Sequence, residues 1–401
     1  MRKFLLTAAS AAALVGFASA QDMVVMAGKL FTGDGVIEDA AVLIEDGKIM
    51  DVGAADDMEW DDDAEMMEAA VVTPGFVDGR TVVGVNGLYN VDADQDADED
   101  TDPNGAELRV IDAYNPLEPL IEYVRAYGVT TMHVTPGDVN PISGQSAVMK
   151  TVGERLDEAM LSESAALLFN LGETPKNVYG GNGGPSTRMA TAALIRKAFI
   201  EAKEWSEKED AGVDLEKEAL AKVLSGDLDA VFAAHRADDI MTAIRIGEEF
   251  GFTPHIAYGT EGYLIADKLA EKGVTVIVTP VLGRAAGSLE TLNASLENAA
   301  ILHDAGVPIV FATHQEGYVP KTRVLLFEAA MAVANGLPDE AAIAAMTKAP
   351  AELLGVDDSV GSIADGRDAD LVLFDGDPFE YRTHVTAVIL DGEPVHRRSA
   401  D

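Results

Sequence analysis

The sequence has 401 residues and no cysteine. Disulfide bridges are therefore excluded as a source of stability, and so is the cysteine that carries the lipid of a bacterial lipoprotein. A zinc ion would have to be held by His, Asp, Glu or a modified Lys. Long apolar runs are also lacking, because no segment reaches the length of a helix that spans a membrane. We therefore expect no membrane insertion.

Basic residues are scarce as well. The chain has 29 Lys and Arg against 69 Asp and Glu, which gives a net charge of −40 at pH 7. Such a charge favours solubility and argues against nucleic acids and anionic membranes as partners. Hydrophobic residues make up 48% of the chain, enough for a sizeable core. The length suits one large domain and a smaller one.

The first twenty residues have the pattern of a secretion signal. Arg2 and Lys3 form a basic start, Phe4–Phe17 is a short apolar run, and Ala18-Ser19-Ala20 fits the small-residue cleavage pattern. We expect cleavage near Ala20 and a periplasmic or secreted mature protein. Residues 1–20 then take no part in the fold.

Both ends of the mature chain have the pattern of short strands. Residues 22–52 and residues 361–396 alternate apolar and polar side chains, and Asp-Gly turns interrupt both segments. We predict that they pair into one small β-sandwich, formed by residues 21–73 and 356–401.

The middle of the chain, residues 74–355, alternates short apolar runs with amphipathic segments. Strands are predicted at Val71–Val77, Val129–Val134, Ala165–Leu171, Ala230–Ala234, Thr253–Ala257, Val274–Val278 and Val307–Ala312, with a further strand near Ala147–Lys150. Helices are predicted at Leu117–Tyr127, Thr187–Glu204, Leu215–Leu224, Asp239–Phe250, Glu261–Lys272, Leu292–Ala305, Thr322–Asn335 and Pro338–Leu354. About eight such units predict an α/β fold, a (β/α)8 TIM-like barrel with a parallel sheet. Reactive side chains are expected at the carboxyl ends of its strands.

An acidic run, residues 92–102, follows the first barrel strand. Its Asp spacing is similar to that of a calcium loop, but Ala97 and Pro103 stand where that loop needs Gly and Glu. We interpret the run as a solvated, flexible loop. The glycine-rich segment 180–188 lacks the ending of a phosphate loop and is interpreted as a mobile connection.

Several segments resemble the amidohydrolase superfamily, in particular imidazolonepropionase-like amidohydrolases. They are residues 28–54 followed by VVTPGFVDGRT, then GVTTMHVTPGDVNPISGQSAVMK, LGETPKNVYG and RMATAALIRKAF, and at the end TKAPAELLGVDDSVGSIADGRDADLVLFDGDP. The resemblance covers essentially the whole mature chain. It implies a metal-bearing barrel with a sandwich built from both termini, and hydrolysis of non-peptide carbon–nitrogen bonds by a metal-activated water.

Most positions where the resemblance places metal ligands carry other residues. Arg80 and Val82 stand at the two positions of the His-x-His motif after strand 1, and Leu168 stands at the strand-4 Lys position. Arginine is permanently charged and offers no lone pair to a metal. We therefore expect that no family-type binuclear site forms and that metal catalysis is altered or lost.

Three candidate catalytic residues remain at strand ends. His235 matches the family's strand-5 His, Tyr258 stands at the strand-6 His position, and His314 replaces the strand-8 Asp. His314 could bind a metal or act as a base near neutral pH. No bound cofactor is expected. The alternative is a rearranged zinc site at His235 and His314, with Glu261, Glu316 or His133 as a third ligand.

Small polar groups near the barrel mouth are candidates for substrate binding. They are Arg80 together with Asn140, Ser143 and Gln145 of the segment after strand 2. Arg80 could pair with Asp78 or with a carboxylate at the rim, or hold an anionic ligand.

Two function classes follow, and both take a small molecule at the barrel mouth. The first is an amidohydrolase-type hydrolase of non-peptide carbon–nitrogen bonds with altered catalysis. The alternative is a periplasmic pseudoenzyme that binds a small molecule or pairs with an active amidohydrolase. A periplasmic solute-binding protein is a third, weaker reading. Self-association or a hetero-oligomer with a related amidohydrolase is also expected.

Overall fold

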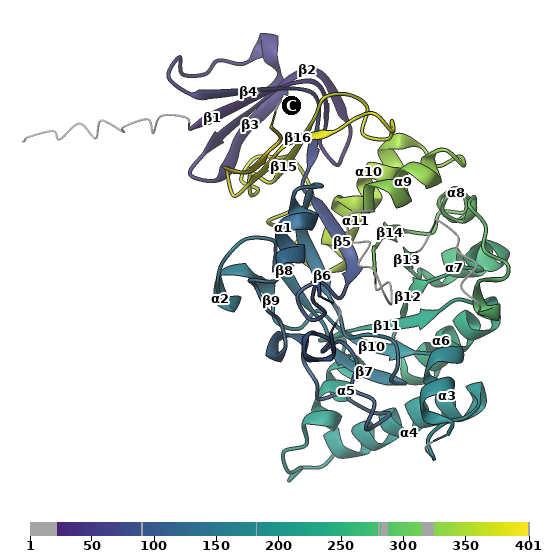
Figure 1. Cartoon of the computed structure of the whole chain (residues 1–401). Helices are drawn as coiled ribbons and strands as arrows, with labels where there is room; N and C mark the ends of the chain where they lie inside the picture. Colours follow the sequence, from purple (N-terminus) through teal and green to yellow (C-terminus); the bar gives the residue numbers. More distant parts are fainter. Residues whose placement is uncertain are drawn as a thin grey trace, which may run out of the picture.

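The computed structural model describes residues 22–89, 91–181, 183–279, 281, 288–314 and 325–399. The predicted secretion signal, residues 1–20, and the candidate ligand Glu316 lie outside these residues. A small β domain sits at one end of a larger α/β domain (Figure 1). In the described part of the chain, no helix is both long and apolar enough to cross a membrane.

The two ends of the chain build the small domain together, as predicted. Its seven strands lie in the order β17-β16-β15-β4-β1-β2-β3. β15 from the end of the chain pairs antiparallel with β4 from its beginning, and alternate side chains from both halves form one apolar core. The strands are β1 (Met23–Phe31), β2 (Val36–Glu45), β3 (Lys48–Ala54), β4 (Glu65–Pro74), β15 (Leu371–Phe374), β16 (Val385–Leu390) and β17 (Glu393–Arg397).

The predicted first barrel strand, Val71–Val77, is divided between the two domains. Its beginning lies in β4 of the small domain, and its end lies in β5 (Phe76–Thr81) of the barrel. Gly75 lies between the two strands. A glycine is needed there, because a side chain at this position would overlap Thr130 of the neighbouring strand. The chain therefore passes from one sheet into the other at a glycine that allows close contact.

The larger domain is a TIM-like barrel. Its strands form two sheets, in the orders β14-β13-β12-β11-β10-β7 and β5-β6-β8-β9. The amide of His314, after β14, donates to the carbonyl of Arg80 on β5 at 2.8 Å, which connects the two sheets. The strands are β6 (Val129–Val134), β7 (Ile142–Gln145), β8 (Ala147–Lys150), β9 (Met160–Ser162), β10 (Ala166–Asn170), β11 (Asp229–Ala234), β12 (His255–Tyr258), β13 (Val276–Val278) and β14 (Ile309–Phe311).

β7 and β8, which follow each other directly at Ser146, run against the predicted all-parallel order. β8 pairs antiparallel with β6, and β7 pairs antiparallel with β10. A parallel neighbour needs a crossover connection of a dozen or more residues, and the short segment 135–141 between β6 and β7 cannot supply one. Ser146, at the junction of β7 and β8, exchanges hydrogen bonds with residues 165 and 166 and so joins the two sheets.

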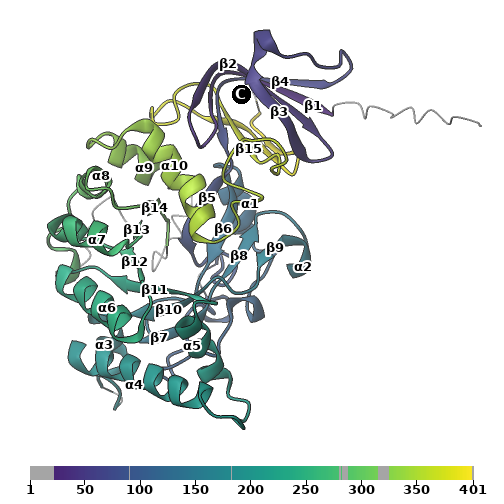
Figure 2. The same cartoon turned by 180° about the vertical axis from the view of Figure 1, so that it is seen from behind.

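Helices cover the outer side of the parallel strands, as Figure 1 and the reverse view in Figure 2 show. The described α-helices are α1 (Pro119–Arg125), α2 (Leu156–Ala159), α3 (Glu173–Tyr179), α4 (Arg188–Ser206), α5 (Leu215–Ser225), α6 (Ala237–Phe250), α7 (Ala266–Lys272), α8 (Asn298–Asp304), α9 (Leu325–Val333), α10 (Asp339–Met346) and α11 (Lys348–Leu353). The helix predicted at Pro338–Leu354 is two helices, because Thr347 leaves the helical conformation.

Candidate functional site

A buried ion pair lies at the carboxyl end of β5. The Arg80 side chain is fully buried, and its Nη2 lies 2.5 Å from Oδ1 of Asp138, in the turn after β6. The guanidinium group also lies over the ring of Tyr258, with its central carbon 5.4 Å from the ring centroid. The side chain of Arg80 therefore pairs with a carboxylate at the rim and not with Asp78. Arg80 donates to the Asp78 carboxylate only through its backbone amide.

Two further side chains contact the same carboxylate. The Tyr258 hydroxyl, at the end of β12, hydrogen-bonds to Oδ2 of Asp138, and Nε2 of His314, after β14, lies 2.8 Å from that oxygen. The Tyr258 hydroxyl and His314 Nε2 are themselves 2.5 Å apart. We refer to Arg80, Asp138, Tyr258 and His314 as the Asp138 cluster.

His235 joins this cluster only through Tyr258. The two rings stack with centroids 4.0 Å apart, while His314 meets the same tyrosine ring edge-on at 5.0 Å. Nδ1 of His235 bonds to the Thr260 hydroxyl at 2.7 Å. Among the described residues, no hydrogen bond joins the two histidines. The Tyr258 ring thus contacts both histidines of the pair proposed for a rearranged zinc site.

Burial sets the charges of the cluster. Burial alone would raise the pKa of Asp138, but the charge of Arg80 and the bonds from His314 and Tyr258 hold it well below its usual range. Burial raises the pKa of Tyr258 well above its usual value and lowers that of His314. It also lowers the pKa of His235 to about 4. At neutral pH only Arg80 and Asp138 are charged.

The protonation states define the hydrogen bonds. A neutral tyrosine and a neutral His314 protonated at Nε2 can both donate to the Asp138 carboxylate, and such charge-assisted bonds are strong. Nδ1 of His314 is then an acceptor, and it is buried without a hydrogen-bond partner in the described structure. Nε and Nη1 of Arg80 are also buried without partners there. The cluster therefore contains buried polar atoms that could bind a ligand beside its ion pair.

The residues at this position do not fit the metal centre that the family resemblance implies. The cation that balances Asp138 is a guanidinium, which has no lone pair for a metal. Val82 and Leu168 are buried apolar side chains. Within the described ranges, no three His, Asp or Glu side chains are arranged to hold a metal ion.

The two described candidates for a third ligand are occupied elsewhere. His133 is fully buried between the Gly79 carbonyl, 2.8 Å from Nδ1, and the Ser146 hydroxyl, 2.7 Å from Nε2. The Glu261 carboxylate accepts from the Ala237 amide and from the Asn293 side chain. Both residues therefore tie barrel elements together.

The other predicted substrate-binding residues do not join the Asp138 cluster. The Ser143 hydroxyl donates to the Gly137 carbonyl at 2.9 Å, and Gln145 donates to the Ala106 carbonyl at 3.1 Å. Asn140 donates to the carbonyls of Glu99 and Asp102. These three side chains connect loops at the mouth of the barrel.

The same bonds anchor the backbone of the acidic loop, residues 92–102. Besides Asn140, the Tyr179 hydroxyl lies 3.1 and 3.0 Å from the carbonyls of Glu99 and Asp102. The Gly137 amide donates to the Ala97 carbonyl at 2.8 Å. Most of the loop is exposed, as predicted for a solvated loop, and buried polar side chains from other elements bind its backbone. They hold the loop against the turn that carries Asp138.

Asp138 was missed by reasoning from the sequence. It lies within the family-like segment GVTTMHVTPGDVNPISGQSAVMK, but its neighbours Pro136 and Gly137 indicate only a turn. The available signal was its place after a predicted barrel strand, where reactive side chains gather.

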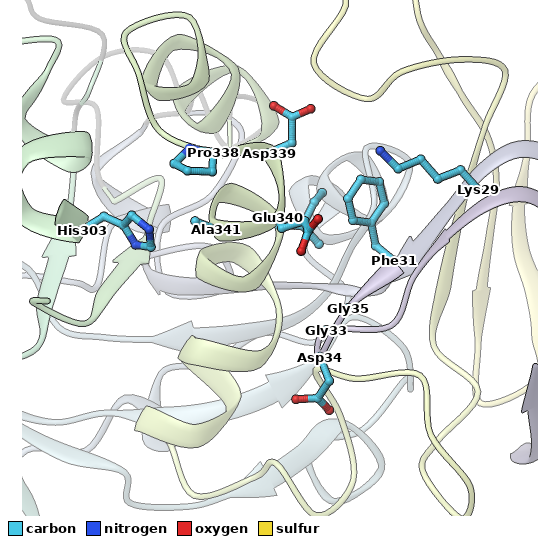
Figure 3. Close-up of a pocket in the computed structure, with 11 residues that line it drawn as sticks. Lys29, Phe31, Gly33, Asp34, Gly35, His303, Pro338, Asp339, Glu340 and Ala341 are labelled. Atoms are coloured by element: carbon cyan, nitrogen blue, oxygen red, sulfur yellow. The ribbon is translucent and has the colours of Figure 1, made fainter. Parts of the chain in front are cut away.

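A cavity of about 660 Å³ lies away from the cluster, between the small domain and the barrel helices (Figure 3). Lys29, Phe31 and Asp34 line it on one side, and His303 and the start of α10 line it on the other. It shares no lining residue with the Asp138 cluster.

A model of the amidohydrolase family matches residues 123–396. The crystal structure of an amidohydrolase from Thermotoga maritima MSB8 is 36% identical, with a TM-score of 0.87, and the match covers 94% of this chain and 100% of that one.

Two curated relatives are more distant. Amidohydrolase tasK of Hapsidospora irregularis is 27% identical over 373 residues, which are 81% of this chain and 36% of tasK, so the chain spans about a third of that relative. An imidazolonepropionase of Rhizobium rhizogenes is 23% identical over 386 residues, which are 85% of this chain and 88% of that protein.

Proposed function

Because this chain belongs to the amidohydrolase family, we propose that it hydrolyses a non-peptide carbon–nitrogen bond of a small molecule at the mouth of its barrel. The family match supports the reaction class. The distant imidazolonepropionase relative favours a cyclic amide as the substrate. We further propose that catalysis is altered, with an ion pair where the resemblance places a metal.

One observation carries this proposal: the buried Arg80 guanidinium pairs with Asp138, and Tyr258 and His314 bind the same carboxylate. A metal ion at that carboxylate would have to displace a paired, permanently charged side chain. The site instead offers a fixed positive charge, a neutral phenol and a neutral imidazole. Such groups bind and polarise a carbonyl group, because fixed donors stabilise the negative charge that develops on its oxygen.

Metal content and turnover test the proposal together. The probes are hydantoin, 4-imidazolone-5-propanoate and acetyl-4-nitroanilide. We expect turnover of at least one probe, unchanged by a chelator, in protein with far less than one zinc per chain. Arg80→Met should abolish turnover, whereas Arg236→Met, which removes an exposed arginine paired with Asp238, should not. One zinc per chain with chelator-sensitive turnover would contradict altered catalysis.

A second candidate function is binding without turnover, by a pseudoenzyme that takes a small molecule or pairs with an active amidohydrolase. It is favoured by the mutual pairing of all four side chains in the Asp138 cluster, because this pairing occupies the Asp138 carboxylate with three donors. Calorimetric binding of a probe with no product formed would support this candidate against the first.

Location and assembly are proposed on the sequence alone. The signal-like residues 1–20 support export to the periplasm or medium. Mass spectrometry of the protein recovered from an exporting host should show a chain that starts near Gln21. Light scattering of that protein would reveal self-association.

A further inference from the structure

The acidic loop brings a second carboxylate to the Asp138 cluster. Asp98 lies in this loop, and its Oδ1 accepts a hydrogen bond from the Val139 amide at 3.3 Å, one residue beyond Asp138. Its carboxylate packs against Gly137, where any side chain would overlap it. Asp98 is nevertheless exposed to solvent, unlike the members of the cluster.

From this geometry we propose, as a step that rests on the proposed hydrolase function, that Asp98 is the proton-transferring residue of the barrel mouth. It is a carboxylate that solvent reaches, held by backbone contacts beside the ion pair. Asp138 is unsuited to this step, because three donors already bind it. His235 and His314 are weaker bases, because burial lowers the pKa of both imidazoles.

The electrostatics of Asp98 support this assignment. Partial burial against the turn and the negative charge of Asp138 raise the pKa of Asp98 to about 6, while the Val139 amide and the more distant Arg80 act in the opposite direction. Asp96 and Glu99 flank it along the acidic loop. A general base works best when its pKa is near the working pH.

The proposed step balances without a further reactant. A water oxygen bonds to the carbonyl carbon of the substrate while Asp98 takes one proton from that water. The carbon–nitrogen bond then breaks, and the proton passes from Asp98 to the leaving nitrogen. The products are a carboxylic acid and an amine. The fixed charge of Arg80 lies nearby to offset the negative charge on the carbonyl oxygen.

The Asp98→Asn variant tests the proposal, because asparagine keeps an oxygen to accept the Val139 amide and removes only the proton transfer. We expect kcat/KM for the hydrolysed probe to fall by about 10²-fold or more. The rise of kcat/KM with pH near 6 should disappear. Asp96→Asn, in the same loop, is the matched control and should keep both. Gly137→Ala should reproduce the loss by displacing the Asp98 carboxylate.

A readout without turnover separates the failure of this inference from failure of the proposed function. Carboxyl ¹³C NMR of aspartate-labelled protein should show one resonance that titrates near pH 6 and is absent from Asp98→Asn. Turnover by the wild type with an unchanged pH profile in Asp98→Asn would overturn the inference alone. No turnover of any probe by the wild type would overturn the proposed function, and with it the catalytic role of Asp98.

Discussion

Two members of the Asp138 cluster stand on backbone that non-glycine residues rarely adopt. Tyr258 has φ of 72° and His314 has φ of 51°. Such conformations cost on the order of 1–3 kcal/mol each and persist where the surrounding structure enforces them. Here the shared carboxylate of Asp138 and the stacking on His235 hold both side chains in place. Strain of this kind is typical of functional sites and supports the role proposed for the cluster.

A pH dependence of stability follows from Asp78, whose burial raises its pKa from 3.8 to about 6 despite bonds from Thr313. A raised pKa means that the folded state binds the proton more tightly than the unfolded state. The stabilisation is therefore complete below pH 3.8 and is lost as the pH rises through 6. It amounts to about 3 kcal/mol, at 1.36 kcal/mol for each pKa unit.

The Asp78→Asn variant isolates this contribution, because asparagine still accepts the Thr313 amide and cannot ionise. Urea unfolding of both proteins between pH 4 and pH 7 should show a difference in unfolding free energy that changes by this amount. A difference that stays constant over that range would contradict the assignment.

At the scale of elements, the antiparallel strands β7 and β8 shape the mouth of the barrel. Because β7 enters from the mouth side, the turn 135–141 and the start of β7 lie beside the carboxyl ends of the parallel strands. This turn carries Asp138 to Arg80 and supplies Asn140 to the acidic loop. A crossover helix at this point would have carried the chain away from the mouth.

The acidic loop should come free when its side-chain anchor is removed. Asn140→Ala deletes the donor to the carbonyls of Glu99 and Asp102, so we expect faster amide hydrogen exchange over residues 97–103. The unfolding free energy should fall by about 1 kcal/mol, because the two carbonyls lose one donor and keep the Tyr179 hydroxyl as a partner. Asn293→Ala, which removes a side-chain bond to Glu261, is the control and should leave exchange in the loop unchanged.

At the scale of the whole molecule, a buried lysine joins the two domains. Lys150 lies at the end of β8 with 6% of its side chain exposed. Its Nζ contacts Asp368 at 2.8 Å, Asp370 at 3.4 Å and also Asp391, all from the carboxyl-terminal part of the small domain. Opposite charges from distant parts of the sequence thus meet where the domains touch.

Replacing this lysine should strongly destabilise the protein. Lys150→Met leaves three carboxylates without their shared cation, at a cost of about 3–5 kcal/mol in unfolding free energy. Lys48 is the matched control, because it contacts the same Asp368 with a half-exposed side chain. Lys48→Met should cost no more than about 1 kcal/mol in a urea titration. Equal costs for the two variants would refute a special role of Lys150.

The sequence by itself determined the chain's plan. Strand and helix periodicity, with the turns at both ends, predicted a barrel and a small domain built from the two termini, because local patterns report which faces are buried. Motifs in order identified the family. They also located Arg80, Tyr258 and His314 at strand ends, since the register of a strand follows from its neighbours in the chain.

Only the tertiary structure decided what these side chains do together. The family-like segment that contains Asp138 assigned it no role, and its pairing with Arg80 depends on the turn before an antiparallel strand. His235 and His314 appeared able to share a metal, but the ring of Tyr258 contacts both of them. The backbone of the acidic loop accepts hydrogen bonds from Asn140 and Tyr179, which are distant from it in the sequence. Distance, burial and charge between separate strands are properties of the folded chain, which local patterns do not contain.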